Sequence, residues 1–332
     1  MTFRLTNSSR WWIAAACALL LLLIVPSPAA HADGGAPNLA YVSGTAKDVS
    51  VIDVAAQKVT RTLNTPATPS MILLSLDARF LYVTQPQANK VTILAAKTGE
   101  TICSANVPGH PTLLALDQSS STIFAAGNDA STVSGLDTAN CTIKRTIDAG
   151  GPVHGLAVAA VGSAVTNTTG NQLWVSAGKA VSSFDTVSGK KLGSVDIPAG
   201  PTYLSIPPGA AVYVTTSEGS VVAIGLNKRE VIPLVSGGQY GPMDFDEITG
   251  EVYVPDKAHH QLVVLTPVNP GFTIPHEPNR TIKLAEAPQS IAITSDGQLG
   301  FSALAGGKVA MLDIPGRQAI TTFDVGGDPH FI

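Results

Sequence analysis

Charged residues are scarce in this sequence. Asp, Glu, Lys and Arg make up 13% of the 332 residues, and the formal net charge is −4. No cluster of Lys and Arg is present that could follow a phosphate backbone, which argues against nucleic acid as a partner. Hydrophobic residues make up 45% of the chain. That is enough to bury a large core, so the composition is that of a folded protein and not of a disordered one.

Motifs that carry chemistry are also missing. After residue 32 the sequence contains no nucleophile elbow, phosphate-binding loop, zinc-protease motif or dinucleotide fingerprint. It contains no C-x-x-C-H motif, which excludes a covalently attached c-type haem. The sequence therefore names no catalytic residue and no cofactor, and it favours a non-catalytic protein.

The amino terminus has the pattern of an export signal. Arg4 and Arg10 give a positive start, and the apolar run over 11–25 is too short to span a membrane comfortably. A small-residue A-x-A cleavage site ends at Ala32. We predict a signal peptide over 1–32, no membrane span after its cleavage, and a periplasmic, extracellular or cell-surface location. An uncleaved signal anchor is the alternative.

Cysteine is rare, with three in the chain. Cys17 lies inside the apolar run, so Cys103 and Cys141 would remain in the exported protein. An oxidising compartment allows two cysteines to pair. These two come from different repeats, so the sequence leaves open whether they lie close enough for a disulfide.

A repeat of about 40 residues runs through the rest of the chain. In each copy a short apolar strand contains an aromatic residue, and a turn leads into a further apolar strand that often ends in Asp. A strand with charged residues follows, and a Gly/Pro turn then opens a fourth strand. The repeated aromatic residues are Tyr41, Tyr82, Phe124, Trp174, Tyr213, Tyr253 and Phe301.

Four strands in each repeat are the pattern of a β-propeller blade, because one four-stranded sheet cannot bury both of its faces and must stack on its neighbours. We predict that residues 33–332 form a single all-β domain, a seven-bladed β-propeller, and that it is a monomer. The strand that follows the Gly/Pro turn is taken as the first strand of a blade. With this numbering the chain begins at the second strand of a blade and ends at the start of a first strand. The N- and C-terminal strands should therefore share blade 1 and close the ring.

The repeat motif resembles that of the YVTN-repeat β-propeller family. The resemblance rests on YVT and YVS strands such as those at Tyr41 and Tyr82, the following VSVID strand, the G-x-P turns and the Ser295-Asp296-Gly297 turn. It covers residues 39–332. It implies an exported or surface protein, often a binding or accessory propeller, and it extends to haem or quinone accessory proteins of periplasmic redox enzymes. The motif describes strands and turns, so it is specific for fold and not for function.

Candidate ligand-binding residues flank the Pro of the turns that open the first strands. These turns crowd the mouth of the central channel, where propeller ligands usually bind. The polar side chains there are His110, His154, Tyr203, Asp244, Gln289 and His330. We expect these residues to face a ligand, either a small molecule or a part of a protein.

A metal-dependent enzyme is the alternative function. If His110, His154, His330 and Asp244 gather around the channel mouth, they could hold a divalent metal for a lactonase or lyase reaction. Only under this alternative is a metal cofactor expected. Convergence of the four side chains in one pocket would favour the enzyme, and side chains that point apart would favour the non-catalytic function.

The strictly repeated residues are predicted to be structural. An Asp that recurs at the end of one strand is more often a turn-forming hydrogen-bond acceptor than a catalyst, and it recurs at Asp53, Asp137, Asp185 and Asp313. The repeated aromatic residues occupy one strand position, so they are expected to pack between blades.

Overall fold

The computed structural model describes residues 38–45, 48–160, 170–209, 211–268 and 280–332. The signal peptide predicted over 1–32, with its cleavage site, lies outside these ranges and stays a prediction. Within the described ranges no helix has the length and the apolar character needed to cross a membrane.

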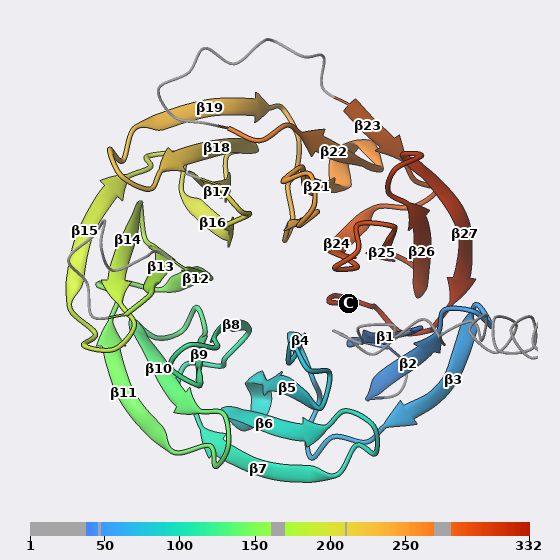
Figure 1. Cartoon of the computed structure of the whole chain (residues 1–332), viewed down its shortest axis with the longest axis horizontal. Coiled ribbons are helices and arrows are strands. Elements are labelled where there is room, and N and C mark those ends of the chain that lie inside the picture. The colour runs from blue at the N-terminus through green and yellow to red at the C-terminus, as the bar shows by residue number, and fades with distance from the viewer. Residues whose placement is uncertain (1–37, 46–47, 161–169, 210, 269–279) are drawn as a thin grey trace, which may run out of the picture. The chain divides into compact units, whose positions relative to one another are not determined.

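The described residues form seven antiparallel sheets arranged around a common centre (Figure 1). Blade 1 contains β1 (Leu39–Val42), β2 (Val49–Asp53) and β3 (Lys58–Leu63). Blade 2 contains β4 (Ile72–Leu74), β5 (Phe80–Gln85), β6 (Lys90–Ala95) and β7 (Thr101–Asn106). Blade 3 contains β8 (Leu113–Asp117), β9 (Thr122–Ala126), β10 (Thr132–Asp137) and β11 (Ile143–Asp148). Blade 4 contains β12 (Val153–Ala159), β13 (Gln172–Ala177), β14 (Ala180–Asp185) and β15 (Lys191–Asp196); blade 5 contains β16 (Pro201–Ser205), β17 (Ala211–Thr216), β18 (Ser220–Gly225) and β19 (Val231–Ser236). Blade 6 contains β20 (Asp244–Phe245), β21 (Val252–Asp256), β22 (Gln261–Leu265) and β23 (Arg280–Lys283); blade 7 contains β24 (Pro288–Ile293), β25 (Leu299–Leu304), β26 (Lys308–Asp313) and β27 (Gln318–Asp324). The short 3₁₀ helices η1 (Pro86–Ala88) and η2 (Lys257–His259) follow β5 and β21. The predicted seven-bladed propeller is confirmed.

Burial differs between the middle and the outermost strands of a blade. In β9 every residue is buried, because both faces of this strand are covered by neighbouring blades. The outermost strand β7 alternates between exposed and partly buried residues instead. This period of two marks a strand with one face toward solvent. The hydrophobic pattern of the sequence follows from this difference.

The hydrophobic core lies in the seams between blades. Seven clusters of buried apolar residues are present among the described residues, and each joins two adjacent blades. All seven repeated aromatic side chains are buried, with at most 6% of their surface exposed. Burying a side chain of this size contributes roughly 1.5–3 kcal/mol. Their predicted role in packing between blades is confirmed.

The repeated Asp residues form hydrogen bonds within their turns, as predicted. Asp53 accepts a hydrogen bond from the amide of Ala56 at 2.8 Å, and Asp313 accepts one from the amide of Gly316 at 2.9 Å. Within its turn, Asp185 accepts hydrogen bonds from the amides of Val187 and Ser188 and from the hydroxyl of Ser188. Each carboxylate satisfies backbone donors that the turn would otherwise leave unpaired.

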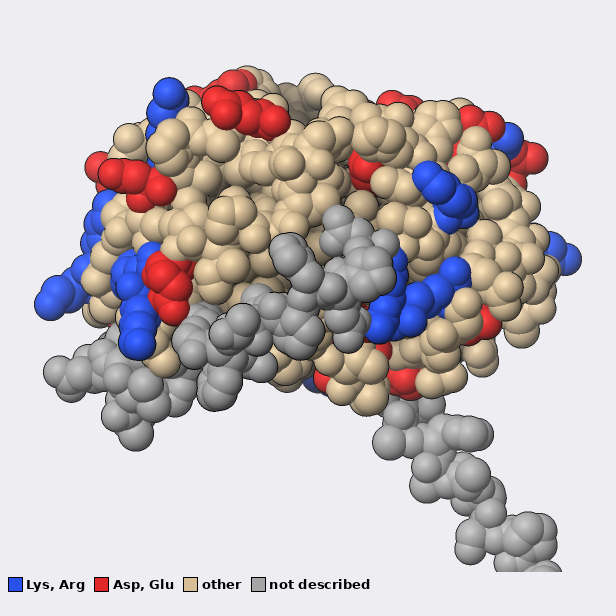
Figure 2. Space-filling model, turned by 90° about the horizontal axis from the view of Figure 1, so that it is seen from above, with Lys and Arg blue, Asp and Glu red and all other residues tan. Residues whose placement is uncertain are grey.

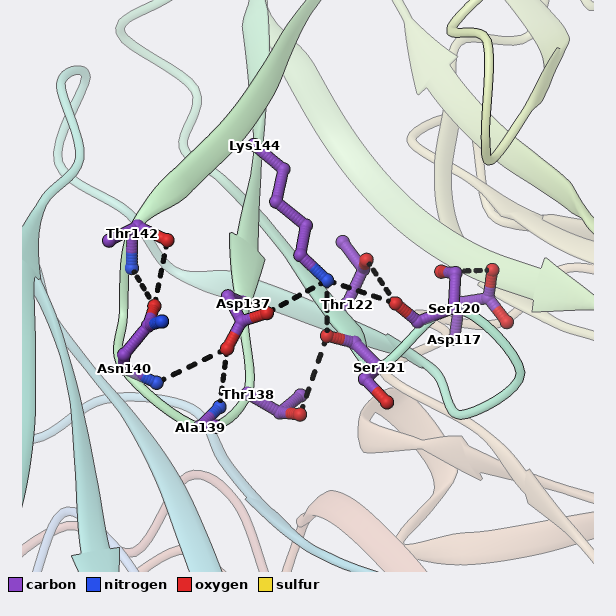
Figure 3. Close-up of polar contacts among 10 residues, drawn as sticks. All are labelled: Asp117, Ser120, Ser121, Thr122, Asp137, Thr138, Ala139, Asn140, Thr142 and Lys144. Carbon is purple, nitrogen blue, oxygen red and sulfur yellow. Dashed lines mark hydrogen bonds and ion pairs between the residues drawn. The ribbon is translucent and has the colours of Figure 1, made fainter.

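The turn at Asp137 also involves a lysine. Asp137 accepts hydrogen bonds from the amides of Ala139 and Asn140, and the Lys144 ammonium lies 2.9 Å from its other oxygen (Figure 3). Lys144 also donates to the carbonyl oxygens of Ser120 and Ser121, which lie in the turn before β9. This hydrogen-bonded ion pair holds the pKa of Asp137 below its usual value. The network ties two turns of blade 3 together, so it is structural.

The C-terminal segment closes the ring. Residues 328–332 lie beside β1 at the inner edge of blade 1, near the ring centre (Figure 1). The amide of Ser43 donates to Phe331 at 2.9 Å, the amide of His330 donates to Ser43 at 3.1 Å, and the amide of Asp328 donates to Gly44 at 2.7 Å. Phe331 packs against the core between blades 1 and 2. The predicted sharing of blade 1 by the two ends of the chain is confirmed.

A disulfide joins Cys103 to Cys141, a question that the sequence leaves open. Cys103 lies on β7 of blade 2, and Cys141 lies in the turn between β10 and β11 of blade 3, with a distance of 5.8 Å between their Cα atoms. Stacking of the two blades brings the pair together.

Charged side chains are spread thinly over the side of the propeller drawn in Figure 2. Lys and Arg occur there in small groups that lie near Asp and Glu, separated by wide uncharged areas. This face therefore carries no continuous basic surface of the kind that follows a nucleic-acid backbone.

Candidate ligand site at the channel mouth

A cavity of about 330 Å³ lies at the end of the channel where the innermost strands begin. All seven blades contribute to its lining. One residue from each blade, in blade order, is His330, Ser70, Thr112, His154, Tyr203, Lys257 and Gln289. Leu113, Val153, Pro242 and Phe331 add apolar surface. The ring closure thus also completes this cavity, because the blade 1 residues belong to the C-terminal segment.

The turns that open the innermost strands, called the leading turns below, are held by hydrogen bonds to the neighbouring strand. In blade 2 the hydroxyl of Thr84 accepts a hydrogen bond from the amide of Met71 at 2.8 Å. In blade 5 the hydroxyl of Thr215 likewise accepts one from the amide of Tyr203 at 3.0 Å. A proline at the start of these strands fixes an extended backbone and needs no donor partner. The side chains that follow it are therefore presented from a rigid support.

Four of the six predicted ligand-binding residues line this cavity. They are His154, Tyr203, Gln289 and His330. The imidazole of His330 lies against Gly44, since a Cβ on that glycine would come within 2.8 Å of its ring carbon Cδ2. Burial raises the pKa of the Tyr203 hydroxyl above its ordinary value. Tyr203 therefore stays a neutral hydrogen-bond donor at physiological pH.

His110 is not part of the channel cavity. It lines a separate cavity of about 490 Å³ at the seam between blades 2 and 3, where its Nδ1 lies 2.7 Å from Asp129 Oδ2. His110 precedes the proline of its turn, whereas His154 and His330 follow theirs, and it has a left-handed backbone with φ of 51°. This offset directs its side chain away from the channel.

Asp244 also faces away from the cavity lining. Its carboxylate accepts a hydrogen bond from the amide of Ile293 on β24 at 2.8 Å. Burial raises the pKa of this carboxyl to about 6, although hydrogen bonds from the amides of Ile293 and Phe245 partly oppose the shift. Asp244 joins blade 6 to blade 7 and does not face a ligand in the channel.

The four residues of the metal alternative therefore do not converge. Across the described ranges, no three His, Cys, Asp or Glu side chains are grouped so that they could hold a metal ion. Two of the four line the channel cavity, one lines the seam cavity, and one is bonded to the backbone of the next blade. The metal centre that the sequence suggested as an alternative is not formed by these residues.

Lys257 is the one charged Lys, Arg, Asp or Glu in this lining, and it was not among the residues predicted from the sequence. It lies four residues after Tyr253, at the start of η2. A signal was present, because no other blade has a charged residue at this position. The equivalents are Thr45, Pro86, Asn128, Gly178, Ser217 and Ala305.

The lining of the cavity contains no carboxylate. Burial lowers the pKa of Lys257, and the charge of Asp328 partly opposes this effect. Asp328 is exposed, and its Oδ2 lies 3.8 Å from His330 Nδ1. The carboxylate whose charge acts on Lys257 thus lies on the surface, and the cavity lining itself presents one lysine, imidazoles and neutral side chains.

Solved structures of other proteins have the same architecture. The dihydro-heme d1 dehydrogenase NirN in complex with DHE is 11% identical with a TM-score of 0.63, and the match covers 91% of this chain and 66% of that chain. The β-propeller domain of Myceliophteria thermophila Cps50 (Swd1) is 12% identical with a TM-score of 0.68, covering 81% and 90%. Hydrazine synthase of Kuenenia stuttgartiensis is 16% identical with a TM-score of 0.65, covering 88% and 93%.

The shared property is the fold. At these identities the likeness shows a β-propeller and carries no activity to this chain. The chain spans just under two thirds of the NirN chain. No protein-family model matches the sequence, and no curated protein matches it either.

Proposed function

We propose that this chain is an exported binding propeller of the YVTN-repeat type, which takes a small ligand at its channel mouth. The observation that carries the proposal is the single cavity to which all seven blades contribute. Its volume of about 330 Å³ falls at the lower end of the range for small-molecule sites, which is roughly 300–1,000 Å³. A small molecule or a single side chain of a protein fits such a space.

Export is supported by two independent features. The sequence pattern over 1–32 is that of a signal peptide. The disulfide between Cys103 and Cys141 is of a kind that persists in oxidising compartments outside the cytosol. Cleavage after Ala32 would be read directly from the N-terminal sequence of the protein secreted by its host.

The binding role is supported by how the lining residues are held. Tyr203 and the other side chains that follow the prolines project from turns bonded to the adjacent strand, so ligand binding would order few groups. The lining combines apolar surface with a few polar groups, which is the usual composition of a small-molecule site.

The test is a library of neutral, cationic and anionic fragments, screened by ligand-observed NMR against the exported protein. Thr112→Trp would fill the cavity, and Thr101→Trp places the same side chain on the exposed strand β7 as a matched control. We expect a subset of fragments whose binding is lost in Thr112→Trp and kept in Thr101→Trp. If every fragment binds both variants equally, the channel mouth is not the binding site and the proposal is wrong.

A further inference from the structure

Lys257 departs from the repeat in its charge. Its side chain is half-buried in a cavity lined by the other six blades as well, and it forms no hydrogen bond or ion pair with another described residue. Removing an ammonium from water without a partner is unfavourable. Packing alone does not explain a lysine here, since the other blades place Thr, Pro, Asn, Gly, Ser or Ala at this point.

Gly241 lies beside the lysine stem. A Cβ on Gly241 would lie 3.6 Å from Lys257 Cε and 2.9 Å from the carbonyl oxygen of Gln289. The stem therefore runs over this glycine toward blade 7, next to a second lining residue. Among the described residues, no carboxylate forms a hydrogen bond or ion pair with this ammonium.

The other polar lining groups can all donate hydrogen bonds. The side chains of Ser70, Thr112, Asn128, His154, Tyr203, Gln289 and His330 each carry an N–H or O–H. An imidazole donates in both of its charge states. No lining side chain is an acceptor only, because the lining has no Asp or Glu. Such a set of donors around one cation matches the several acceptor lone pairs of an oxyanion.

We propose that the channel-mouth cavity binds its ligand through an oxyanion, a carboxylate or a phosphate group, that pairs with Lys257. The apolar side chains Leu113, Val153 and Phe331 then contact the body of the ligand. This inference rests on the proposed function and specifies the chemical class of the ligand. Asp328 acts on Lys257 through its charge and lies 3.8 Å from His330, so it competes with the ligand for both residues.

Three probes with the same ring separate the possible head groups. Benzoate carries a carboxylate, phenyl phosphate carries a phosphate, and benzamide is a neutral analogue of benzoate. Their dissociation constants are measured by NMR titration of the exported protein at fixed pH and ionic strength. We expect at least one anion to bind in the cavity and benzamide to bind at least about tenfold more weakly, as for the loss of a hydrogen bond to a charged group. The tighter anion identifies the head group.

Variants assign the effect to the lysine. Lys257→Met keeps the stem over Gly241 and should weaken anion binding by about tenfold to a hundredfold. Lys179→Met removes the same charge from an exposed turn at the same end of the propeller, outside the cavity, and should leave binding unchanged. Asp328→Asn should strengthen anion binding. The thermal unfolding midpoint of each variant shows that it is folded.

The possible failures are distinct. If benzamide binds as tightly as the anions, or if Lys257→Met binds anions like the unaltered protein, the oxyanion inference is overturned. If the binding of benzamide or another neutral compound is still lost in Thr112→Trp, the proposed function stands and only the oxyanion inference fails. If Thr112→Trp changes the binding of no compound, both proposals fail.

Discussion

The amide of Ser43 donates a hydrogen bond to the carbonyl oxygen of Phe331 at 2.9 Å, although 288 positions separate the two residues in the sequence. This contact places the end of the chain at the inner edge of blade 1. It removes the unpaired strand edge that an open ring would expose. It also brings His330 to the channel cavity, so ring closure and site formation depend on the same five residues.

Gly44→Ala should open this closure. Gly44 has a positive φ of 78°, and a Cβ there would lie 2.2 Å from the carbonyl oxygen of Asp328. Gly150→Ala is the matched control, since its φ of 79° is the same while nothing lies within 4 Å of its Cβ position. Both variants carry the strain of a left-handed alanine, roughly 1–2 kcal/mol. We expect Gly44→Ala to lose several kcal/mol more in urea unfolding, since it also disrupts closure hydrogen bonds worth roughly 0.5–1.5 kcal/mol each. Equal losses in the two variants would show that the closure adds no stability.

The disulfide should stabilise the seam between blades 2 and 3. Cys103 and Cys141 are separated by 38 residues, and a cross-link over a loop of this length is worth roughly 2–4 kcal/mol through its effect on the unfolded chain. Replacing both cysteines by serine should lower the free energy of unfolding by this amount. A reductant should destabilise the unaltered protein to the same extent and leave the double variant unchanged. A double variant as stable as the oxidised protein would contradict the prediction.

Asp244 should make the protein less stable at neutral pH. Its pKa is raised from 3.8 to about 6 in the folded state, so the folded protein keeps a proton that the unfolded chain has already lost between these values. Protonated Asp244 therefore contributes fully to the free energy of unfolding below pH 3.8, and this contribution is lost as the pH rises through about 6. Asp244→Asn keeps an acceptor for the amide of Ile293 and should raise the free energy of unfolding at pH 7.5, on the order of 2 kcal/mol.

The measurement for Asp244 is urea unfolding from pH 3.5 to pH 8. The gain in Asp244→Asn should shrink as the pH falls and vanish in the most acidic samples. Asp196→Asn, on an exposed position of β15, controls for the change in net charge. A gain that is independent of pH would contradict the proposed cause.

The repeated Asp residues should differ in importance according to their bonds. Asp185 is 2% exposed and accepts hydrogen bonds from the amides of Val187, Ser188 and Gly170, whereas Asp53 accepts one from the amide of Ala56 in a more open turn. Asp185→Ala should cost about 2–3 kcal/mol and Asp53→Ala about 1 kcal/mol, at roughly 1 kcal/mol for each lost bond. Thermal and urea unfolding of the two variants measures this order. A larger loss in Asp53→Ala would contradict it.

The architecture was predictable because its determinants recur along the chain. Each repeated aromatic residue, such as Trp174 or Tyr213, lies in a strand and fills a seam. Each Asp that ends a strand, such as Asp137, bonds to its own turn. Strands and turns depend on near neighbours in sequence, so a period of four strands determines the blade. The number of copies and their phase then determine the ring and its closure.

The site was only partly predictable because side-chain direction depends on single backbone angles and on the adjacent blade. His110 and His154 both flank a proline of a leading turn, yet a left-handed backbone directs His110 to the blade seam. Asp244 was expected at the cavity and instead bonds to β24 of the next blade. Lys257 was missed because its place in the cavity depends on how blade 6 packs beside the other blades.

By itself the sequence determined the strands, the blades, their number and the sharing of blade 1, since these follow from local periodicity and from counting repeats. Only the tertiary structure decided that Cys103 meets Cys141 and that Lys257 joins His154 and His330 in one cavity. The physical reason is that these groups belong to different blades. Their distances depend on how the sheets stack around the ring, which the pattern within one repeat does not record.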